Sequence, residues 1–161
     1  MSTDPLTVGQ GQKTREKHRA TVVVGLDGSD TSWDACSWAC GEARRLGARI
    51  VAVYVTPIAE VGLAATAAGA AAVTEALDES AARQAEQLRE QLFRTALDGG
   101  CEMEFVHARG EPASELVRVA EAVQADQIVV GRSTKALHHV AGSIGRRLIA
   151  KRGAPVVVVV P

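Results

Sequence analysis

Two kinds of hydrophobic pattern alternate along this chain of 161 residues. The first is a short, unbroken run rich in valine and isoleucine, which is typical of a strand buried on both faces of a sheet. The second is a longer segment with apolar residues every three or four positions, which is typical of an amphipathic helix. The expected strands comprise residues 20–25, 49–57, 101–110, 126–131 and 154–161. The expected helices comprise residues 32–46, 74–97, 111–125 and 143–151.

These elements alternate strictly along the chain, which predicts an α/β fold. Strands that are apolar throughout need cover on both faces, and parallel strands need helical crossovers between them. We therefore expect a three-layer sandwich, in which helices cover both faces of a five-stranded parallel sheet. Residues 1–19 show no apolar period and predict a disordered leader, so the folded domain should span 20–161. The small-residue segment Ala59–Val73 is expected to be a loop without regular structure.

Composition and charge exclude several classes of function. Lysine and arginine (18) nearly balance aspartate and glutamate (19), and aromatic residues make up only 3% of the chain. Nucleic-acid binding is therefore not expected, because it needs basic patches or aromatic stacking platforms. No apolar run is long enough to span a membrane, and no secretory signal is apparent. The odd number of cysteines, three, favours a reducing compartment, so we expect a cytoplasmic protein without a membrane partner.

Candidate chemistry lies in the loop after the first expected strand. Ligands of open α/β sheets bind outside the carboxyl ends of the strands, where the strand order reverses. In the stretch GLDGS, Gly25 lacks a side chain that would block a ligand, and Asp27 offers a carboxylate to a ribose hydroxyl or a base amino group. The alternative interpretation is that Asp27 and Ser29 only turn the chain and cap the following helix.

A second candidate lies after the fourth expected strand, in the stretch VVGRSTKALHHVAGSIGRR. Here Gly131 ends the strand, and the pair Gly142 and Ser143 precedes an expected helix. The N–H groups and the positive dipole end of such a helix attract phosphate. The alternative is an ordinary solvated basic loop.

Three blocks of this sequence together resemble the universal stress protein family. They are VVVGLDGSDTS, GEPASELVRVAEAVQADQIVVG and GSIGRRLIAKRGAPVVVVV, in this order, and the resemblance covers nearly all of residues 21–161. It implies a Rossmann-like sheet with strand order 3-2-1-4-5. It also implies a homodimer that pairs through the last strand, Val156–Val160, and it places Asp27 close to Gly131.

The resemblance also implies an adenine-nucleotide site. One branch of the family binds ATP through a glycine, two residues, a second glycine, nine residues, and a glycine followed by serine or threonine. Here Gly131 and the pair Gly142 and Ser143 match the two ends of that pattern. Thr134 replaces the middle glycine, and ten residues separate Gly131 from Gly142 where the pattern has twelve. The implied nucleotide-binding residues are Gly25, Asp27, Ile50, Val130, Gly131, Thr134, Gly142, Ser143 and Ile144.

The function implied by the resemblance is a dimeric stress-response sensor or regulator that binds ATP, or alternatively AMP or ADP. Mg²⁺ is expected only together with a bound nucleotide. We expect no enzymatic turnover, and we rank slow ATP hydrolysis or self-phosphorylation last. The competing hypothesis is a structural or adaptor dimer of the family branch that lacks the ATP motif. Cys36 and Cys40 are expected to be buried apolar residues rather than metal ligands, with Cys101 and His107 on a distant segment.

Overall fold

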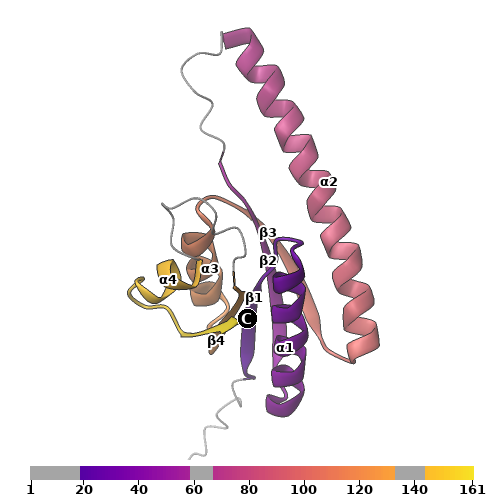
Figure 1. The fold of residues 1–161 in the computed structure, drawn as a ribbon, viewed down its shortest axis with the longest axis vertical. Coiled ribbons are helices and arrows are strands. Elements are labelled where there is room, and N and C mark those ends of the chain that lie inside the picture. Colours follow the sequence, from indigo (N-terminus) through magenta and orange to yellow (C-terminus); the bar gives the residue numbers. More distant parts are fainter. Residues whose placement is uncertain (1–18, 59–66, 133–143) are drawn as a thin grey trace, which may run out of the picture.

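The computed structural model describes residues 19–58, 67–132 and 144–161 of the chain (Figure 1). Within these ranges, strands and helices alternate as predicted. The strands are β1 (Thr21–Gly25), β2 (Arg49–Thr56), β3 (Met103–Arg109), β4 (Gln127–Gly131) and β5 (Val156–Val160). The helices are α1 (Asp30–Leu46), α2 (Ala67–Gly99), α3 (Pro112–Ala122) and α4 (Ile144–Ile149).

The five strands form one parallel sheet in the order β3-β2-β1-β4-β5, which confirms the predicted fold class and strand order. Strand β1 lies at the centre, with Gly25 paired to Val53 of β2 and Val24 paired to Val129 of β4. The chain builds the sheet outwards from β1 to β3 and then returns to the other side of β1. The strand order therefore reverses between β1 and β4, which is where the carboxyl edge of such a sheet forms a crevice.

Helices cover both faces of the sheet, as expected. Alternate residues of β1 point to opposite faces: Val22 and Val24 pack in the core beneath α1 and α2, whereas Val23 packs in the core beneath α3 and α4. Figure 1 shows α1 and α2 on one side of the strands and α3 and α4 on the other. The apolar interiors of β1 and β4, whose polar residues Thr21 and Gln127 stand at the first position, follow from this double cover.

Helix α2 begins at Ala67, seven residues before the predicted start at Thr74. The prediction of a loop was therefore wrong for residues 67–73. Five of these seven residues are alanine, the strongest helix former, so the segment needs no apolar stripe to continue the helix. Residues 59–66, the rest of that predicted loop, lie outside the described residues. Among the described residues, none of the helices is long and apolar enough to cross a membrane.

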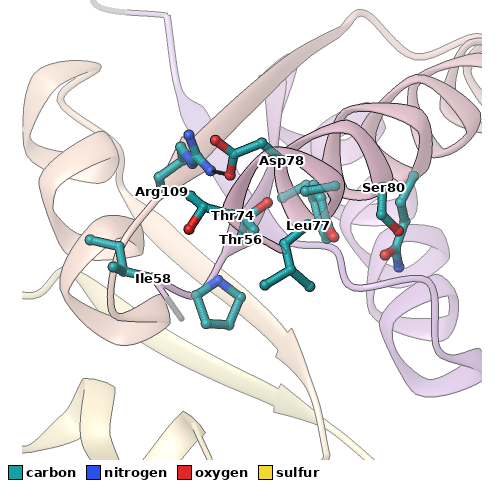
Figure 2. Close-up of a pocket in the computed structure, with 11 residues that line it drawn as sticks. Thr56, Ile58, Thr74, Leu77, Asp78, Ser80 and Arg109 are labelled. Atoms are coloured by element: carbon teal, nitrogen blue, oxygen red, sulfur yellow. Dashed lines mark hydrogen bonds and ion pairs between the residues drawn. The ribbon is translucent and has the colours of Figure 1, made fainter. Parts of the chain in front are cut away.

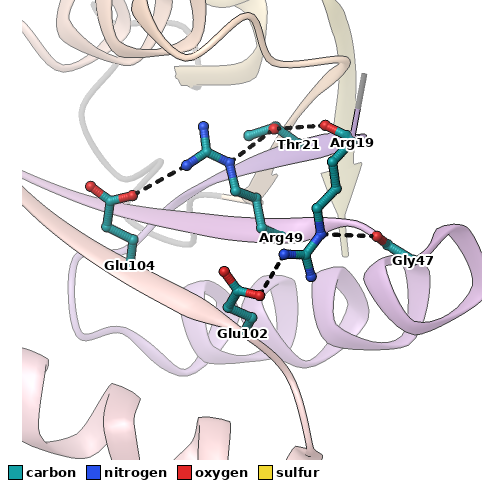
Figure 3. A network of polar contacts seen from close by, with 6 residues as sticks. All are labelled: Arg19, Thr21, Gly47, Arg49, Glu102 and Glu104. Atoms are coloured by element: carbon teal, nitrogen blue, oxygen red, sulfur yellow. Dashed lines mark hydrogen bonds and ion pairs between the residues drawn. The ribbon is translucent and has the colours of Figure 1, made fainter. Parts of the chain in front are cut away.

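Arg19, the last residue of the predicted leader, belongs to a polar network at the amino edge of the sheet (Figure 3). Its Nε donates to the carbonyl oxygen of Gly47 at 3.3 Å, and its Nη1 lies 2.6 Å from Oε2 of Glu102. Arg49 is paired with Glu104 at 3.6 Å in the same network. These pairs are largely exposed, so each is expected to contribute no more than about 1 kcal/mol. Residues 1–18 lie outside the described residues, so the predicted disorder stays a prediction there.

Candidate functional site

The turn after β1 holds Asp27 at the carboxyl edge of the sheet. The buried residue before it, Leu26, donates its N–H to the carbonyl oxygen of Val53 at 2.9 Å and so extends the strand pairing. Gly28 then turns the chain with a φ of +84°, a conformation that favours glycine. Oδ1 of Asp27 accepts hydrogen bonds from the N–H of Ser29 at 2.9 Å and from its hydroxyl at 2.5 Å. The carboxylate is thus exposed but held in one orientation.

Ser29 is the N-cap of α1, which begins at Asp30, two residues before its predicted start. Its Oγ accepts a hydrogen bond from the N–H of Ser32 at 3.3 Å. This confirms the interpretation in which Asp27 and Ser29 turn the chain and cap the helix. A ligand role for Asp27 is compatible with it, because an ionised carboxylate accepts several hydrogen bonds.

Ser32 is a residue of this edge that the sequence analysis missed. It is buried, its Oγ accepts from the N–H of Asp27 at 3.3 Å, and its hydroxyl donates to the carbonyl oxygen of Ser29 at 2.8 Å. These bonds fix the whole turn against the first turn of α1. The positive end of the α1 dipole therefore lies at the carboxyl edge, beside Asp27. No sequence motif marks Ser32, and only its place in the first helical turn after a cap could have drawn attention to it.

Gly131, at the end of β4, packs directly against the same helical turn. A Cβ atom on Gly131 would lie 2.2 Å from the carbonyl oxygen of Thr31 and 2.9 Å from the nitrogen of Ser32. The carboxyl ends of β1 and β4 therefore meet at the first turn of α1, in keeping with the adjacency of the two strands. The backbone of α1 fills the space that the missing side chain leaves. Close packing alone accounts for glycine at this position.

Three further predicted site residues face the core beneath α3 and α4 instead of the carboxyl edge. A Cβ atom on Gly25 would lie 3.2 Å from Cγ1 of Val130 and 3.3 Å from Cδ1 of Leu116. The side chain of Val130 is buried in this core, and Ile144 packs against it. The side chains of Val130 and Ile144 thus have packing roles, Gly25 leaves room for Leu116, and only the backbones of the three residues are suited to contact a ligand at the edge. The other predicted residues, Thr134, Gly142 and Ser143, lie outside the described residues.

The structure does not bring Ile50 to the site, so this prediction was wrong. Ile50 is the second residue of β2, it is 0% exposed, and it pairs with Val22 and Met103 towards the amino edge. Since Gly25 pairs with Val53, the β2 residue nearest the level of Asp27 is Val55, two positions further on. Val55 is half-buried. The error was one of register along the strand, which the sequence of β2 alone does not reveal.

Helix α4, which follows residues 133–143, is attached to the rest of the domain through Glu111. This residue is the N-cap of α3, and its carboxylate accepts from the N–H groups of Ala113 at 3.0 Å and Ser114 at 2.8 Å. The same carboxylate pairs with Arg147 at 3.0 Å and with Lys151 at 3.7 Å. Burial by itself would raise the pKa of Glu111, but the bonds from Ser114 and Ala113 and the charge of Arg147 lower it to about 2.

We expect Glu111→Gln to lower stability at neutral pH. Because the folded pKa of about 2 lies below the ordinary value of 4.5, the carboxylate stabilises the fold above pH 4.5, and this contribution is lost as the pH falls towards 2. With 34% of the side chain exposed, the discounted loss is about 1 kcal/mol. Urea unfolding at pH 7 and at steps down to pH 2 measures it. The exposed Glu121→Gln, on the same helix, is the control, and an equal effect of both variants at pH 7 would contradict the assignment.

A cavity of about 590 Å³ opens at the same carboxyl edge, between the ends of β2 and β3 and helix α2 (Figure 2). Its wall combines apolar side chains, among them Leu77 and Ile58, with the ion pair between Arg109 and Asp78. The mixed lining suits a small molecule that has both apolar and polar groups. No pattern in the sequence indicates this cavity, because its wall combines residues from elements far apart in the chain.

His107 lies on β3, opposite Tyr54 of β2. Its Nε2 lies 2.7 Å from Oγ1 of Thr56, and its ring stacks on Tyr54 with centroids 5.3 Å apart. Burial, and secondarily the charge of Arg109, lowers the pKa of His107. Through these contacts with Thr56 and Tyr54, the histidine supports the end of β2.

Comparison with known proteins identifies the family. The model of the universal stress protein family matches residues 18–160. The chain belongs to the universal stress protein family. A universal stress protein of Methanocaldococcus jannaschii is 30% identical over 141 residues, which is 86% of this chain and 80% of that protein.

Solved structures of universal stress proteins share the fold. One of them was determined in complex with cAMP and has a TM-score of 0.68 at 24% sequence identity. The match covers 89% of this chain and 98% of that protein. Another, from Archaeoglobus fulgidus in complex with dAMP, has a TM-score of 0.53 at 26% identity and covers 89% of this chain and 99% of its own.

Proposed function

We propose that this universal stress protein binds an adenine nucleotide at the carboxyl edge between β1 and β4 and acts in the cytoplasm as a stress-response sensor or regulator. The observation that carries the proposal is the convergence of the Asp27 carboxylate and the first turn of α1 at the point where the strand order reverses. Structures of similar proteins in complex with cAMP and dAMP support it.

The described residues fit the adenosine part of such a ligand. The oriented carboxylate of Asp27 is suited to accept hydrogen bonds from ribose hydroxyls or a base amino group. Val55 offers an apolar surface at the same level. We further propose that the nucleotide is ATP with Mg²⁺. The contacts to its triphosphate would come from Thr134, Gly142 and Ser143. When bound, the metal would offset phosphate charge.

We assign binding rather than turnover to this edge. The hydroxyl of Ser29 donates to Asp27, and the hydroxyl of Ser32 donates to the carbonyl oxygen of Ser29, so both serve the turn and the helix cap. A sensor needs no more than reversible binding, and these fixed groups provide a site that is already organised.

Calorimetric titration with ATP, ADP and AMP, each with Mg²⁺, tests the proposal. We expect Asp27→Asn to weaken binding about tenfold or more, because it removes a charge-assisted hydrogen bond while preserving side-chain shape. The matched control is Asp30→Asn, at the exposed first residue of the same helix, which should change the affinity by less than about threefold. Equal affinities of Asp27→Asn and the unchanged chain, or no binding at millimolar nucleotide, would refute the proposed site.

A second candidate function is an adaptor that binds no nucleotide. It is favoured by the packing of Gly131, because close contact with the α1 backbone accounts for glycine at this position without a ligand. The loss of the middle glycine at Thr134 points the same way. Nucleotide that stays bound in stoichiometric amount through purification would exclude this candidate.

Both candidates include a homodimer that pairs through β5. This strand lies at an edge of the sheet and consists of five valines, of which Val156 is 65% exposed and Val159 is 42% exposed. An apolar edge strand of this kind favours pairing with another strand. Sedimentation velocity checks the assembly, for which the proposal requires twice the 16.9 kDa mass of the chain.

A further inference from the structure

Cys40 and Cys101, expected on distant segments, lie together at the end of the domain opposite the proposed nucleotide site. Cys40 belongs to the carboxyl-terminal half of α1, and Cys101 lies in the connection between α2 and β3. Sγ of Cys101 is 3.6 Å from the carbonyl oxygen of Cys40 and 3.5 Å from that of Gly99. The fold therefore places a pair of thiols side by side, although 61 positions separate them in the sequence.

Gly99, which has no side chain, lies beside the two sulfur atoms. A Cβ atom built on Gly99 would lie 3.6 Å from Sγ of Cys40 and 3.7 Å from Sγ of Cys101, so both sulfurs border the same small space. Gly99 and Gly100 precede Cys101, and neither has a side chain that would hinder movement of the Cys101 sulfur towards its neighbour. A bond between the two sulfurs would have to form within this small space beside Gly99.

The cysteines differ in their access to solvent. Cys36 and Cys40 are buried, and burial is the main cause that raises the pKa of Cys36 to about 11 and that of Cys40 to about 12. Cys101 is half-buried and lines a hollow of about 550 Å³ at the amino edge, together with Arg19 and Arg44. A small oxidant in the hollow thus reaches Cys101 first, beside the guanidinium groups of Arg19 and Arg44.

We propose that Cys101 is a site of oxidation by hydroperoxides and that Cys40 converts the oxidised form into an intramolecular disulfide. The Cys101 thiolate attacks one peroxide oxygen, the O–O bond breaks, and the other oxygen leaves as water or an alcohol after it gains a proton. The sulfenic acid so formed is attacked by the Cys40 sulfur, the S–O bond breaks, and water leaves with the thiol proton. The two thiols lose two electrons in total, and the peroxide gains them.

The disulfide would join α1 to the end of α2 at the amino edge. It would close a loop of 61 positions, so the oxidised chain should unfold at a temperature several degrees higher than the reduced chain. The proposal does not depend on nucleotide binding, because the paired thiols and the carboxyl edge lie at opposite ends of the strands.

The test treats the full reduced chain with equimolar hydrogen peroxide, followed by thiol titration, intact mass and peptide mapping. Of the three thiols in the chain, one should remain. The mass should fall by two hydrogen atoms, and one cross-linked peptide should join Cys40 to Cys101. Cys36→Ser, the matched control, should form the same disulfide. Cys101→Ser, with its fold checked by circular dichroism, should lose its thiols at least about tenfold more slowly.

Three outcomes would overturn the proposal. The first is sulfinic or sulfonic acid on Cys101 with Cys40 still a free thiol. The second is a disulfide between two chains, seen as a dimer on a non-reducing gel. The third is unchanged thiols after treatment with equimolar peroxide.

Discussion

Replacing Gly131 by alanine is expected to destabilise the folded chain by about 3 kcal/mol or more. The new Cβ atom would lie 2.2 Å from the carbonyl oxygen of Thr31, which is far inside van der Waals contact. The obstacle is backbone rather than a flexible side chain, so the end of β4 or the first turn of α1 must move. That movement would also disturb the hydrogen bonds of Ser32 that hold the turn at Asp27.

Urea unfolding of the unchanged chain and of Gly131→Ala measures this effect. The matched control is Gly41→Ala in the same helix, where an added Cβ would meet nothing within 4 Å. This control should gain about 0.5–1 kcal/mol, because alanine costs less backbone entropy than glycine within a helix. Full stability of Gly131→Ala would contradict the close approach of β4 to α1. A loss of nucleotide binding in this variant would not by itself show a contact with phosphate, since the site rests on the same packing.

Leu116→Ala is expected to destabilise the chain by about 2–5 kcal/mol, through lost burial and the cavity left behind. Leu116 is 1% exposed on α3, and its Cδ1 lies 3.3 Å from the position of a Cβ on Gly25. The leucine therefore fills the space beneath the end of β1, immediately before the turn that holds Asp27. For a domain of this size, the loss corresponds to a fall in the melting temperature of roughly 5–15 °C.

Thermal and urea unfolding measure the Leu116→Ala effect, with Leu97→Ala as the control of the same chemical change. Leu97 is 83% exposed on α2, so its truncation should change stability by no more than about 0.5 kcal/mol. Similar losses for the two variants would contradict the placement of Leu116 in the core. A double variant of Gly25→Ala and Leu116→Ala adds a finer check. The smaller side chain at position 116 should relieve the crowding caused by the new methyl group, so the two effects should be less than additive.

The hydrophobic pattern by itself determined the fold class. The apolar runs of β1, β2 and β4 need cover on both faces, and this requirement leads to a parallel sheet between two layers of helices. The start of α2 was placed too late, because an alanine-rich helix carries no apolar stripe to mark it. Asp27 and Ser29 were found from sequence because the turn and the helix cap are local, so their chemistry depends on neighbours along the chain.

Contacts between distant segments were decided only by the tertiary structure. Gly131 was expected to be a nucleotide-binding residue, but the backbone of Thr31, one hundred positions earlier in the chain, occupies the place where its side chain would lie. The level of Val55 beside Asp27 follows from the pairing of β2 with β1, and neither strand specifies this register alone. Cys40 meets Cys101 for the same reason. Local patterns specify the individual helices, strands and caps. Sites built from several elements depend on how those elements pack, because the sequence of one element does not specify its partner in a contact.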